Sequence, residues 1–373
     1  MGVPFFDIGR LNASIADDIA SAAQRALTSS WYILGKEGEA FESQMSLQLG
    51  SGRVLGCNSG TDALILSLLA ADIGIEDEVI TVAHTAIPTV AAICAVGAIP
   101  VLIDIDYDTW ALDVTKIAEV LTQKTKAIIV VHLYGNMVDV NSVRNVVCSA
   151  GRSDIAIIED VAQAQGAELN SQSAGTIGRF GAFSFYPSKN IGALGDGGAV
   201  CCNNEADVEQ VRMLRNYGQK DRYHTEISRG TNSRLDEIQA AILSAKLPFL
   251  KNWNKRKACL MERYRTELSG LPLKFQQVTS GCEPAWHLCV VALDAPERRD
   301  QLIAHFQREE IQTLIHYPIP NHRQPAFAHA IIQDLSVTDS LVGRILSLPF
   351  SPILSDDEQT IVINSARAFF GAA

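Results

Sequence analysis

The stretch RVLGCNSGTDALILSLLAA (53–71) joins a short apolar run to a longer one, with Gly60 and Thr61 at the junction. Residues 53–57 are typical of a strand buried on both faces, and residues 62–72 of a helix packed on a sheet. A strand that runs directly into a helix turns free backbone N–H groups and the positive end of the helix dipole toward one point. The stretch predicts one strand–helix unit and, at its turn, either an anion site or an ordinary capped helix.

The same alternation of short apolar runs with amphipathic segments continues to about residue 215. The predicted strands are 53–57, 77–82, 99–104, 126–132, 154–159, 182–185 and 198–202. The predicted helices are 13–28, 62–72, 85–96, 114–123, 140–150 and 204–215. Strands that alternate with helices are the signature of a mostly parallel α/β sheet.

A long helical pattern starts near residue 235 and closes at Gly270, and the rest of the 373-residue chain mixes short strands with helices. A chain of this length is expected to form two or three domains. We expect a large domain over residues 1–250 and a smaller C-terminal α+β domain over residues 251–373.

Composition and charge exclude several classes of protein. The formal net charge of −11 disfavours nonspecific nucleic-acid binding, which needs a basic surface. The eight cysteines show no C-x-x-C and no zinc-ligand spacing, so we expect no metal site and a reducing cytoplasm. The first twenty residues lack an export signal, and the apolar run 82–104 is interrupted by His84, Pro88, Gly97 and Pro100. We therefore expect a cytoplasmic protein without a membrane span.

The segment DIAIIEDVAQAQGA (154–167) brings carboxylates to the end of a buried strand. Open α/β sheets bind ligands at the carboxyl ends of their strands. Asp160 could keep a pyridine nitrogen protonated there, which would make the ring an electron sink, and Gln163 could bond a ring substituent. The alternative is that Asp160 only caps the next helix.

The segment FGAFSFYPSKNIGALGDGGAV (180–200) follows an apolar strand with Lys189 and a glycine-rich turn. A lysine that is desolvated or lies near other positive charge is neutral and nucleophilic near pH 7, as Schiff-base chemistry requires. The glycines do not form a dinucleotide-binding pattern, because they follow a lysine loop and precede a strand. This disfavours a dehydrogenase.

Taken together, these motifs resemble the DegT/DnrJ/EryC1/StrS family of pyridoxal-phosphate-dependent sugar aminotransferases, whose fold is that of fold-type-I aminotransferases. The order and spacing of nine segments carry the resemblance: VPFFDI (3–8), WYILGKEGEAFE (31–42), NSGTDAL (58–64), VHLYGN (131–136), IEDVAQAQGA (158–167), FSFYPSKNIGALGDGG (183–198), GTNSRLDEIQAAIL (230–243), IHYPIPNHRQPAF (315–327) and LPFSPILSDDEQ (348–359).

The resemblance implies a role for each matching residue. Lys189 would hold pyridoxal 5'-phosphate (PLP) as an internal aldimine and move protons, Asp160 would meet the pyridine nitrogen, and Gln163 would lie beside the ring hydroxyl. The phosphate would be held by Gly60, Thr61 and Ser184, and by Asn232 of the neighbouring chain in a homodimer. Candidate substrate contacts are Tyr32, Tyr186, Arg229, His316 and Tyr317.

The resemblance also implies the reaction, the transfer of an amino group from glutamate to a keto carbon of a nucleotide-linked sugar. The segment 313–327 is similar to that of enzymes acting on 3-keto-6-deoxyhexoses, so we expect amination at C3 of a thymidine-linked sugar. The alternatives are amination at C4 and a PLP-binding regulatory protein without turnover. A related sugar dehydratase would carry histidine in place of Lys189.

Two positions depart from the family pattern. Gln165 stands where many relatives have histidine. Ala86 stands where many have an aromatic residue that stacks on the cofactor ring, and His84 is a weak substitute. His132 is expected to be a structural histidine at a strand end. Lys220, Arg222 and Arg229 could face a pyrophosphate or simply lie in a solvated loop.

Overall fold

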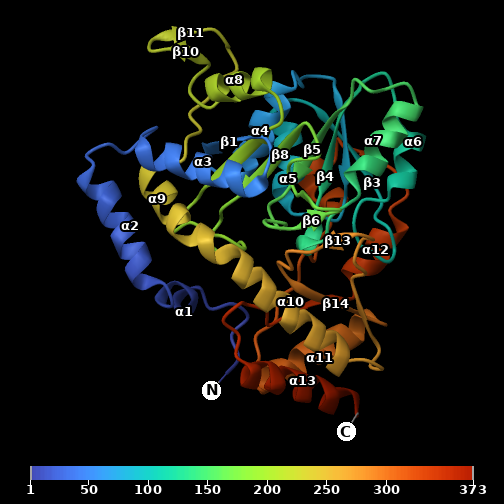
Figure 1. Cartoon of the computed structure of the whole chain (residues 1–373). Coiled ribbons are helices and arrows are strands. Elements are labelled where there is room, and N and C mark those ends of the chain that lie inside the picture. The colour runs from blue at the N-terminus through green and yellow to red at the C-terminus, as the bar shows by residue number, and fades with distance from the viewer. Residues whose placement is uncertain (1, 372–373) are drawn as a thin grey trace.

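The computed structural model describes residues 2–371, and its centre is an eight-stranded sheet (Figure 1). The strand order is β1-β9-β8-β5-β4-β2-β3-β15, and β9 alone runs antiparallel to its neighbours. The strands are β1 (Arg53–Cys57), β2 (Glu78–Val82), β3 (Ile99–Ile103), β4 (Thr125–Val131), β5 (Ala156–Asp160), β8 (Phe180–Ser184), β9 (Gly198–Cys202) and β15 (Ile331–Ile332). The expected α/β fold is confirmed, and each of the seven predicted strands lies within two residues of its expected bounds.

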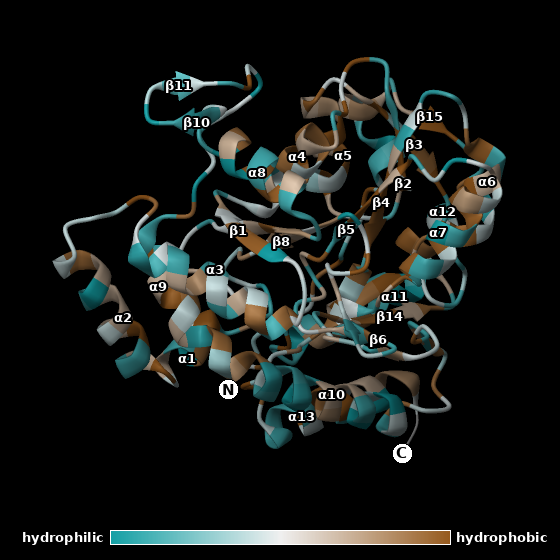
Figure 2. Ribbon diagram, turned by 45° about the horizontal axis from the view of Figure 1, so that its top comes forward, coloured by the Kyte–Doolittle hydropathy of each residue, from teal (hydrophilic) through white to brown (hydrophobic). Residues whose placement is uncertain are grey.

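Helices cover this sheet because its strands are apolar on both faces. They are α3 (Lys36–Leu49), α4 (Gly60–Ala70), α5 (Ile87–Ala95), α6 (Ile117–Val120), α7 (Val140–Ser149), α8 (Glu205–Leu214) and α9 (Glu237–Lys246). Residues 127–131 of β4 are all buried, and β4 shows the brown of hydrophobic residues in Figure 2.

Three predicted helical stretches differ from the structure. The long pattern from about residue 235 to Gly270 is divided into α9, a 3-10 turn (Leu247–Phe249) and α10 (Leu250–Glu267). The helix expected over 13–28 begins three residues later, as α2 (Ala16–Thr28), and a separate short helix that was not expected, α1 (Ile8–Ala13), precedes it. Helix α2 packs on α9 through buried alanines, among them Ala22 and Ala241. The helix expected over 114–123 shortens to a 3-10 turn (Val114–Lys116) followed by α6, because Leu121 is already extended. Local sequence patterns predict the ends of such helices poorly, because tertiary packing decides where the helices begin and end.

A second core lies in the C-terminal part of the chain. The antiparallel sheet β12 (Leu273–Phe275), β14 (Cys289–Leu293) and β16 (Ile345–Leu348) packs with α10 (Leu250–Glu267), α11 (Pro296–Arg308) and α13 (Asp356–Phe370). The expected boundary at residue 250 coincides with the start of α10. Two segments cross it: Val3 joins the second core, while β15 pairs with β3 and Phe327 packs beside Leu102 on the main sheet.

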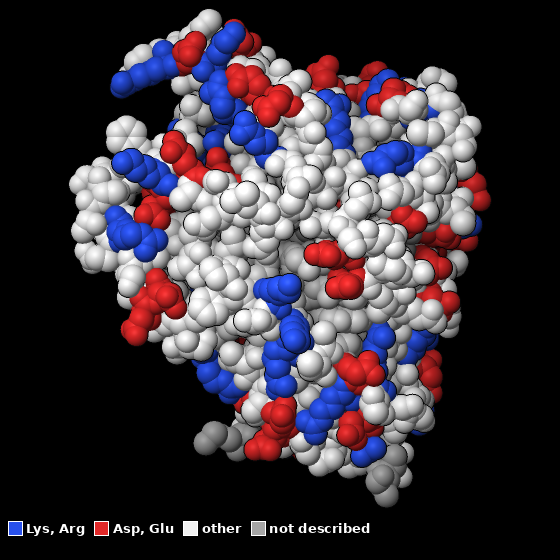
Figure 3. Space-filling view, viewed as in Figure 1, with Lys and Arg blue, Asp and Glu red and all other residues white. Residues whose placement is uncertain are grey.

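The remaining elements are short. They are α12 (Ser336–Val342), the sheet of β13 (Cys282–Glu283), β6 (Glu168–Leu169) and β7 (Gln172–Ser173), and the projecting hairpin of β10 (Gln219–Asp221) and β11 (His224–Thr225) in Figure 1. Acidic and basic side chains are mixed over the face in Figure 3. Within residues 2–371, no helix has the length and hydropathy of a membrane span, and no group of three or more His, Cys, Asp or Glu side chains has metal-binding geometry.

Candidate active site

The candidate site lies at the carboxyl ends of β5 and β8, two neighbouring parallel strands. Asp160 is the last residue of β5 and Ser184 the last of β8, and the register Asp160↔Ala182 places the two ends together. Lys189 follows five residues after Ser184. Parallel strands collect their terminal side chains at one edge, where ligands of open α/β sheets bind.

The turn before α4 is a close-packed cradle for an anion. Ser59 caps the helix by accepting a 3.1 Å hydrogen bond from Asp62 N, and α4 begins at Gly60. A β-carbon on Gly60 would lie 2.5 Å from Ser184 Cβ, and one on Gly198 would lie 2.2 Å from Ser59 O. Only glycine permits these approaches. The α4 N–H groups and the Ser184 hydroxyl therefore meet where a phosphate group would fit.

Asp160 is buried and held from two sides. Thr89 Oγ1 donates to Asp160 Oδ2 at 2.9 Å, and Ala162 N donates to Oδ1 at 3.1 Å. Burial raises the pKa of Asp160, whereas these hydrogen bonds and nearby Lys189 lower it. The carboxyl is thus fixed in orientation at the bottom of the site, as a partner for a pyridine N–H must be.

Lys189 has the electrostatic character that imine chemistry needs. Its backbone N–H donates to Tyr186 O at 2.8 Å, which makes it the end of a tight turn. Burial lowers the pKa of its amine to about 8, while the Asp160 carboxylate raises it. About a tenth of the amine is therefore neutral and nucleophilic at pH 7, far more than for an ordinary lysine.

Gln165 anchors the Lys189 turn, a role that the sequence did not reveal. Its Nε2 donates to Ser184 O at 2.5 Å, and its Oε1 accepts from Ile191 N at 3.0 Å. Lys246 Nζ donates to Gly192 O at 2.8 Å just beyond. Gln165, which differs from the histidine of many relatives, thus has a structural role: its side chain bonds the backbone before and after Lys189.

Gln163 connects the cofactor side of the site to the C-terminal part of the chain. Its Oε1 accepts from Tyr134 N at 2.7 Å, and its Nε2 donates to the Tyr317 hydroxyl at 2.8 Å. Burial raises the pKa of Tyr317 to about 12 and lowers that of His316 to about 4. His316 Nδ1 lies 2.9 Å from Ser347 Oγ. His316 and Tyr317 are therefore both neutral polar groups.

The side chains of the other predicted substrate and phosphate residues form no hydrogen bond with these groups within one chain. Tyr32, Tyr186 and Asn232 are exposed. Arg229 was expected near the substrate, but its guanidinium bonds Asp72 Oδ1 at 2.6 Å and Ile73 O at 3.0 Å. These acceptors follow the far end of α4, about 16 Å along the helix from Gly60 at roughly 1.5 Å per residue. The structure does not bring Arg229 to the site of its own chain.

The basic residues of the hairpin region also have local partners. Lys220 Nζ bonds Glu226 Oε1 at 3.2 Å, and the Arg222 guanidinium lies 5.0 Å from the centre of the Tyr223 ring.

His84 and His132 are structural histidines. His84 is completely buried and its Nε2 lies 2.8 Å from the Tyr134 hydroxyl, so it has no free face to stack on a cofactor. Ala86 is half-buried and caps α5 without a side-chain hydrogen bond. His132 Nε2 bonds Glu159 at 2.9 Å while its Nδ1 accepts from Val138 N at 3.2 Å, as expected of a structural histidine.

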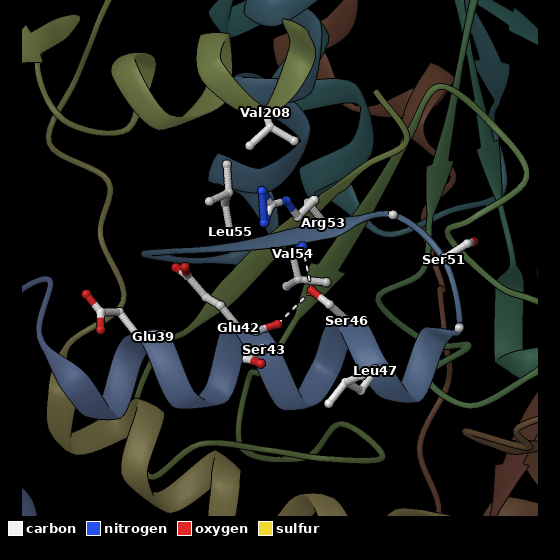
Figure 4. Close-up of a pocket in the computed structure, with 12 residues that line it drawn as sticks. Glu39, Glu42, Ser43, Ser46, Leu47, Ser51, Arg53, Val54, Leu55 and Val208 are labelled. Atoms are coloured by element: carbon white, nitrogen blue, oxygen red, sulfur yellow. Dashed lines mark hydrogen bonds between the residues drawn. The ribbon is translucent and has the colours of Figure 1, made fainter. Parts of the chain in front are cut away.

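A separate surface pocket of about 700 Å³ lies between α3 and β1 (Figure 4). Glu39, Glu42 and Arg53 carry charge on its lining, and Ser46 Oγ bonds Val54 N at 3.0 Å. Glu42 Oε1 is already occupied by Gly56 N at 2.8 Å and by Arg215 at 2.5 Å. This pocket is bounded by the edge strand β1 and includes none of the residues around Lys189.

Comparisons with known proteins agree with this geometry. The DegT/DnrJ/EryC1/StrS aminotransferase family model matches residues 13–367. The erythromycin biosynthesis sensory transduction protein EryC1 of Saccharopolyspora erythraea is 43% identical, over 99% of this chain and 100% of its own. The dTDP-3-amino-3,4,6-trideoxy-alpha-D-glucose transaminase of Streptomyces venezuelae is 40% identical, over 98% of this chain and 95% of its own.

The crystal structure of S. venezuelae DesV in complex with a ketimine intermediate superimposes with a TM-score of 0.94, at 38% identity, covering 100% of this chain and 99% of that one. A second similar structure, NtdA of Bacillus subtilis, has the cofactor PMP, the amine form of PLP, bound; it superimposes with a TM-score of 0.90 at 28% identity, covering 99% of this chain and 85% of that one. The buried Asp160, the glycine cradle and the depressed pKa of Lys189 fit that cofactor. This chain is a PLP-dependent aminotransferase, and it belongs to the DegT/DnrJ/EryC1/StrS family.

Proposed function

We propose that the protein transfers an amino group from glutamate to C3 of a thymidine-linked 3-keto-6-deoxy sugar, as a homodimer with shared active sites. The observation that carries the proposal is the 2.8 Å hydrogen bond from Gln163 Nε2 to the Tyr317 hydroxyl, which joins the 316–321 loop to a residue that we expect to bind the cofactor. The S. venezuelae relative, whose name specifies a dTDP-linked 3-amino sugar, supports the choice of carbon and nucleotide.

The residues around Lys189 fit the proton transfers of this reaction. PLP, when bound, supplies an electron sink for the substrate carbon next to nitrogen. Lys189 Nζ, with its pKa lowered to about 8, takes a proton from one carbon and returns it to another, as a general acid/base with a pKa near the working pH does best. Asp160 keeps its position through Thr89 and Ala162 and holds a proton on the ring nitrogen.

The residues on the other side of the site fit a neutral sugar. Tyr317 keeps its proton at physiological pH because burial raises its pKa to about 12, and His316 stays neutral because burial lowers its pKa to about 4. Sugar hydroxyls and a keto oxygen are neutral hydrogen-bonding groups, so uncharged partners bind them without the cost of burying an unpaired charge. We assign Tyr317 as a donor to a sugar oxygen and His316 as a hydroxyl contact.

Several exposed side chains support an active site that is shared between the two chains of a homodimer. Asn232 is held only through its backbone, where Asn58 Nδ2 donates to its carbonyl at 3.2 Å, and its side chain is exposed beside the phosphate cradle. Large apolar side chains that are exposed in the single chain include Trp31 at 63%, Tyr32 at 55% and Tyr186 at 55%. Exposed aromatic groups of this kind are typical of interface residues. Tyr32 and Tyr186 would then reach the substrate in the dimer.

The test offers purified enzyme glutamate with 3-keto and 4-keto 6-deoxyhexoses, each linked to thymidine or uridine diphosphate, and locates the new amine by NMR. We expect a product aminated at C3 of the thymidine-linked sugar. A shift of about 1 Å in the reacting carbon can cost roughly a hundredfold in rate, so one carbon should dominate. Amination confined to C4, or to the uridine-linked sugars, would contradict that part of the proposal.

A second candidate is a PLP-binding regulatory protein without turnover. The EryC1 relative favours this regulatory role, because its name describes a sensory transduction protein. The geometry of Lys189 and Asp160 favours catalysis instead. Multiple turnovers with glutamate and a keto sugar would exclude a purely regulatory role, whereas a single stoichiometric conversion would support it.

A further inference from the structure

Tyr134 makes four hydrogen bonds at the edge of the site, and neither its motif nor its burial alone reveals them. It follows β4 in the 3-10 turn Leu133–Gly135 and is buried. Its backbone N–H donates to Gln163, and its carbonyl accepts from His287 N at 2.8 Å. Its hydroxyl lies 2.8 Å from His84 Nε2 and donates to the carbonyl of His316.

The donor and acceptor in each of these hydrogen bonds follow from the backbone groups, because a backbone N–H can only donate and a backbone carbonyl can only accept. A backbone N–H can only donate, so Gln163 must turn its Oε1 toward Tyr134 and its Nε2 toward Tyr317. A backbone carbonyl can only accept a hydrogen bond, so the Tyr134 hydroxyl donates its proton to the His316 carbonyl. The hydroxyl oxygen then accepts a hydrogen bond from His84 Nε2. The Tyr317 oxygen accepts from Gln163, so its own proton remains free for a ligand.

These bonds close a ring of four residues. Tyr134 N binds Gln163, Gln163 binds the Tyr317 hydroxyl, Tyr317 is joined covalently to His316, and the His316 carbonyl binds the Tyr134 hydroxyl. Residues 134 and 316 are 182 positions apart in sequence: Tyr134 lies in the turn that follows β4 of the main sheet, and His316 lies in the loop that follows α11. The ring therefore connects the cofactor side of the site to its sugar side.

We propose that Tyr134 is a positioning residue that fixes the Gln163 amide through its backbone and the 316–321 loop through its hydroxyl, so that the Tyr317 proton is free for the sugar. The sugar part of this inference rests on the proposed function. The role assigned to Tyr134 is to orient Gln163, His316 and Tyr317 and not to touch the reacting atoms.

The rest of the loop supports this assignment. Asn321 holds the C-terminal end of the 316–321 loop. The Asn321 N–H donates to Ala83 O at 3.0 Å, and Asn321 Nδ2 donates to Thr85 O at 2.8 Å. Pro318 and Pro320 stiffen the residues between. Tyr134 itself has φ 62°, a left-handed conformation that is unfavourable for a residue with a β-carbon and is tolerated where several bonds hold it.

The test compares Tyr134→Phe with Tyr264→Phe. Tyr264 is a matched control because it is also fully buried and its hydroxyl also donates to a backbone carbonyl, that of Pro349, at 2.9 Å. Hydrogen exchange is measured on the apoenzyme by mass spectrometry. We expect amides of residues 314–321 to exchange about tenfold faster in Tyr134→Phe, the effect of losing one buried hydrogen bond, and no such local change in Tyr264→Phe.

Kinetics of the two half-reactions give a second readout. Because the Tyr134→Phe variant would keep the backbone bond to Gln163, cofactor affinity and the glutamate half-reaction should stay within about twofold of wild type, while kcat/KM for the sugar half-reaction falls about tenfold. Equal losses in both half-reactions, or unchanged exchange over residues 314–321, would overturn the proposal.

A second variant covers the case in which Tyr134→Phe does not fold. His84→Leu removes the donor to the Tyr134 hydroxyl and keeps the tyrosine, and it should accelerate exchange of the same amides by a smaller factor. Unchanged exchange in that variant would also overturn the role of Tyr134. The exchange experiment needs no substrate, so a wild-type enzyme inactive on every keto sugar would refute the proposed function and leave the role of Tyr134 to be decided by exchange.

Discussion

The Thr89 hydroxyl donates a 2.9 Å hydrogen bond to Asp160 Oδ2 across 71 residues of sequence. Thr89 lies in the first turn of α5 and Asp160 at the end of β5, and both are buried. Thr85 Oγ1, 3.0 Å from Thr89 Oγ1, extends the contact. Because Ala162 N holds the other oxygen, the carboxyl has a single orientation. Asp160 is thus held in one orientation at the end of β5, as its proposed role beside the cofactor ring requires.

Asp160→Asn should lower the turnover number by about a hundredfold or more, because an amide cannot hold the proton on the pyridine nitrogen as a carboxylate does. Cofactor affinity should also fall, as measured by titration of the apoenzyme with PLP. Thr89→Val is the matched control: it removes one hydrogen bond and keeps the carboxylate, so its loss of rate should be much smaller. No helix follows Asp160 in the structure, so the helix-cap alternative is ruled out, and unchanged turnover in Asp160→Asn would show that Asp160 does not act on the cofactor ring.

The rate at which the apoenzyme captures PLP should depend on the pKa of Lys189. Burial lowers this pKa to about 8, so the reactive neutral amine predominates above pH 8 and decreases about tenfold per pH unit below it. The capture rate, followed by visible absorbance, should rise up to about pH 8 and then level off. Lys189→Ala should show neither this absorbance nor turnover.

The Asp160 carboxylate raises the pKa of Lys189, so Asp160→Asn should move the start of this plateau to lower pH. A rate that still rises toward pH 10.5, the ordinary pKa of a lysine, would contradict the depressed pKa.

Gln165→Leu should destabilise the apoenzyme by about 1–3 kcal/mol, because Ser184 O and Ile191 N would lose their buried partner. Gln165→His offers one donor and one acceptor and should cost much less. Urea unfolding of the two apoenzymes measures the difference. Equal stability of Gln165→Leu and wild type would show that the turn before and after Lys189 is held by other contacts.

Mixing Lys189→Ala chains with Asn232→Ala chains tests the shared site. Each variant alone should be inactive, and a heterodimer should contain one site with both wild-type residues. Random pairing should restore about a quarter of the wild-type activity, since half of the dimers are mixed and each has one intact site. The absence of recovery, with subunit exchange shown by mass spectrometry, would place Asn232 outside the neighbour's site.

The main sheet was predictable from the sequence because its signals are local. Residues 53–71 and 154–160 show the apolar runs of buried strands and the start of a helix within a few positions of one another. Such patterns survive folding because each strand and helix must bury its own apolar residues. The same locality made Lys189 and Asp160 recognisable as candidates at strand ends.

The sequence by itself therefore determined the α/β fold and the chemical groups at the ends of β5 and β8. Only the tertiary structure decided which distant residues pair with one another: Tyr134 with His316 and Gln165 with Ile191 around the site, and Arg229 with Asp72 away from it. The physical reason is that a hydrogen bond depends on distances of about 3 Å between specific atoms, and for residues far apart in sequence these distances are set by how strands and helices pack.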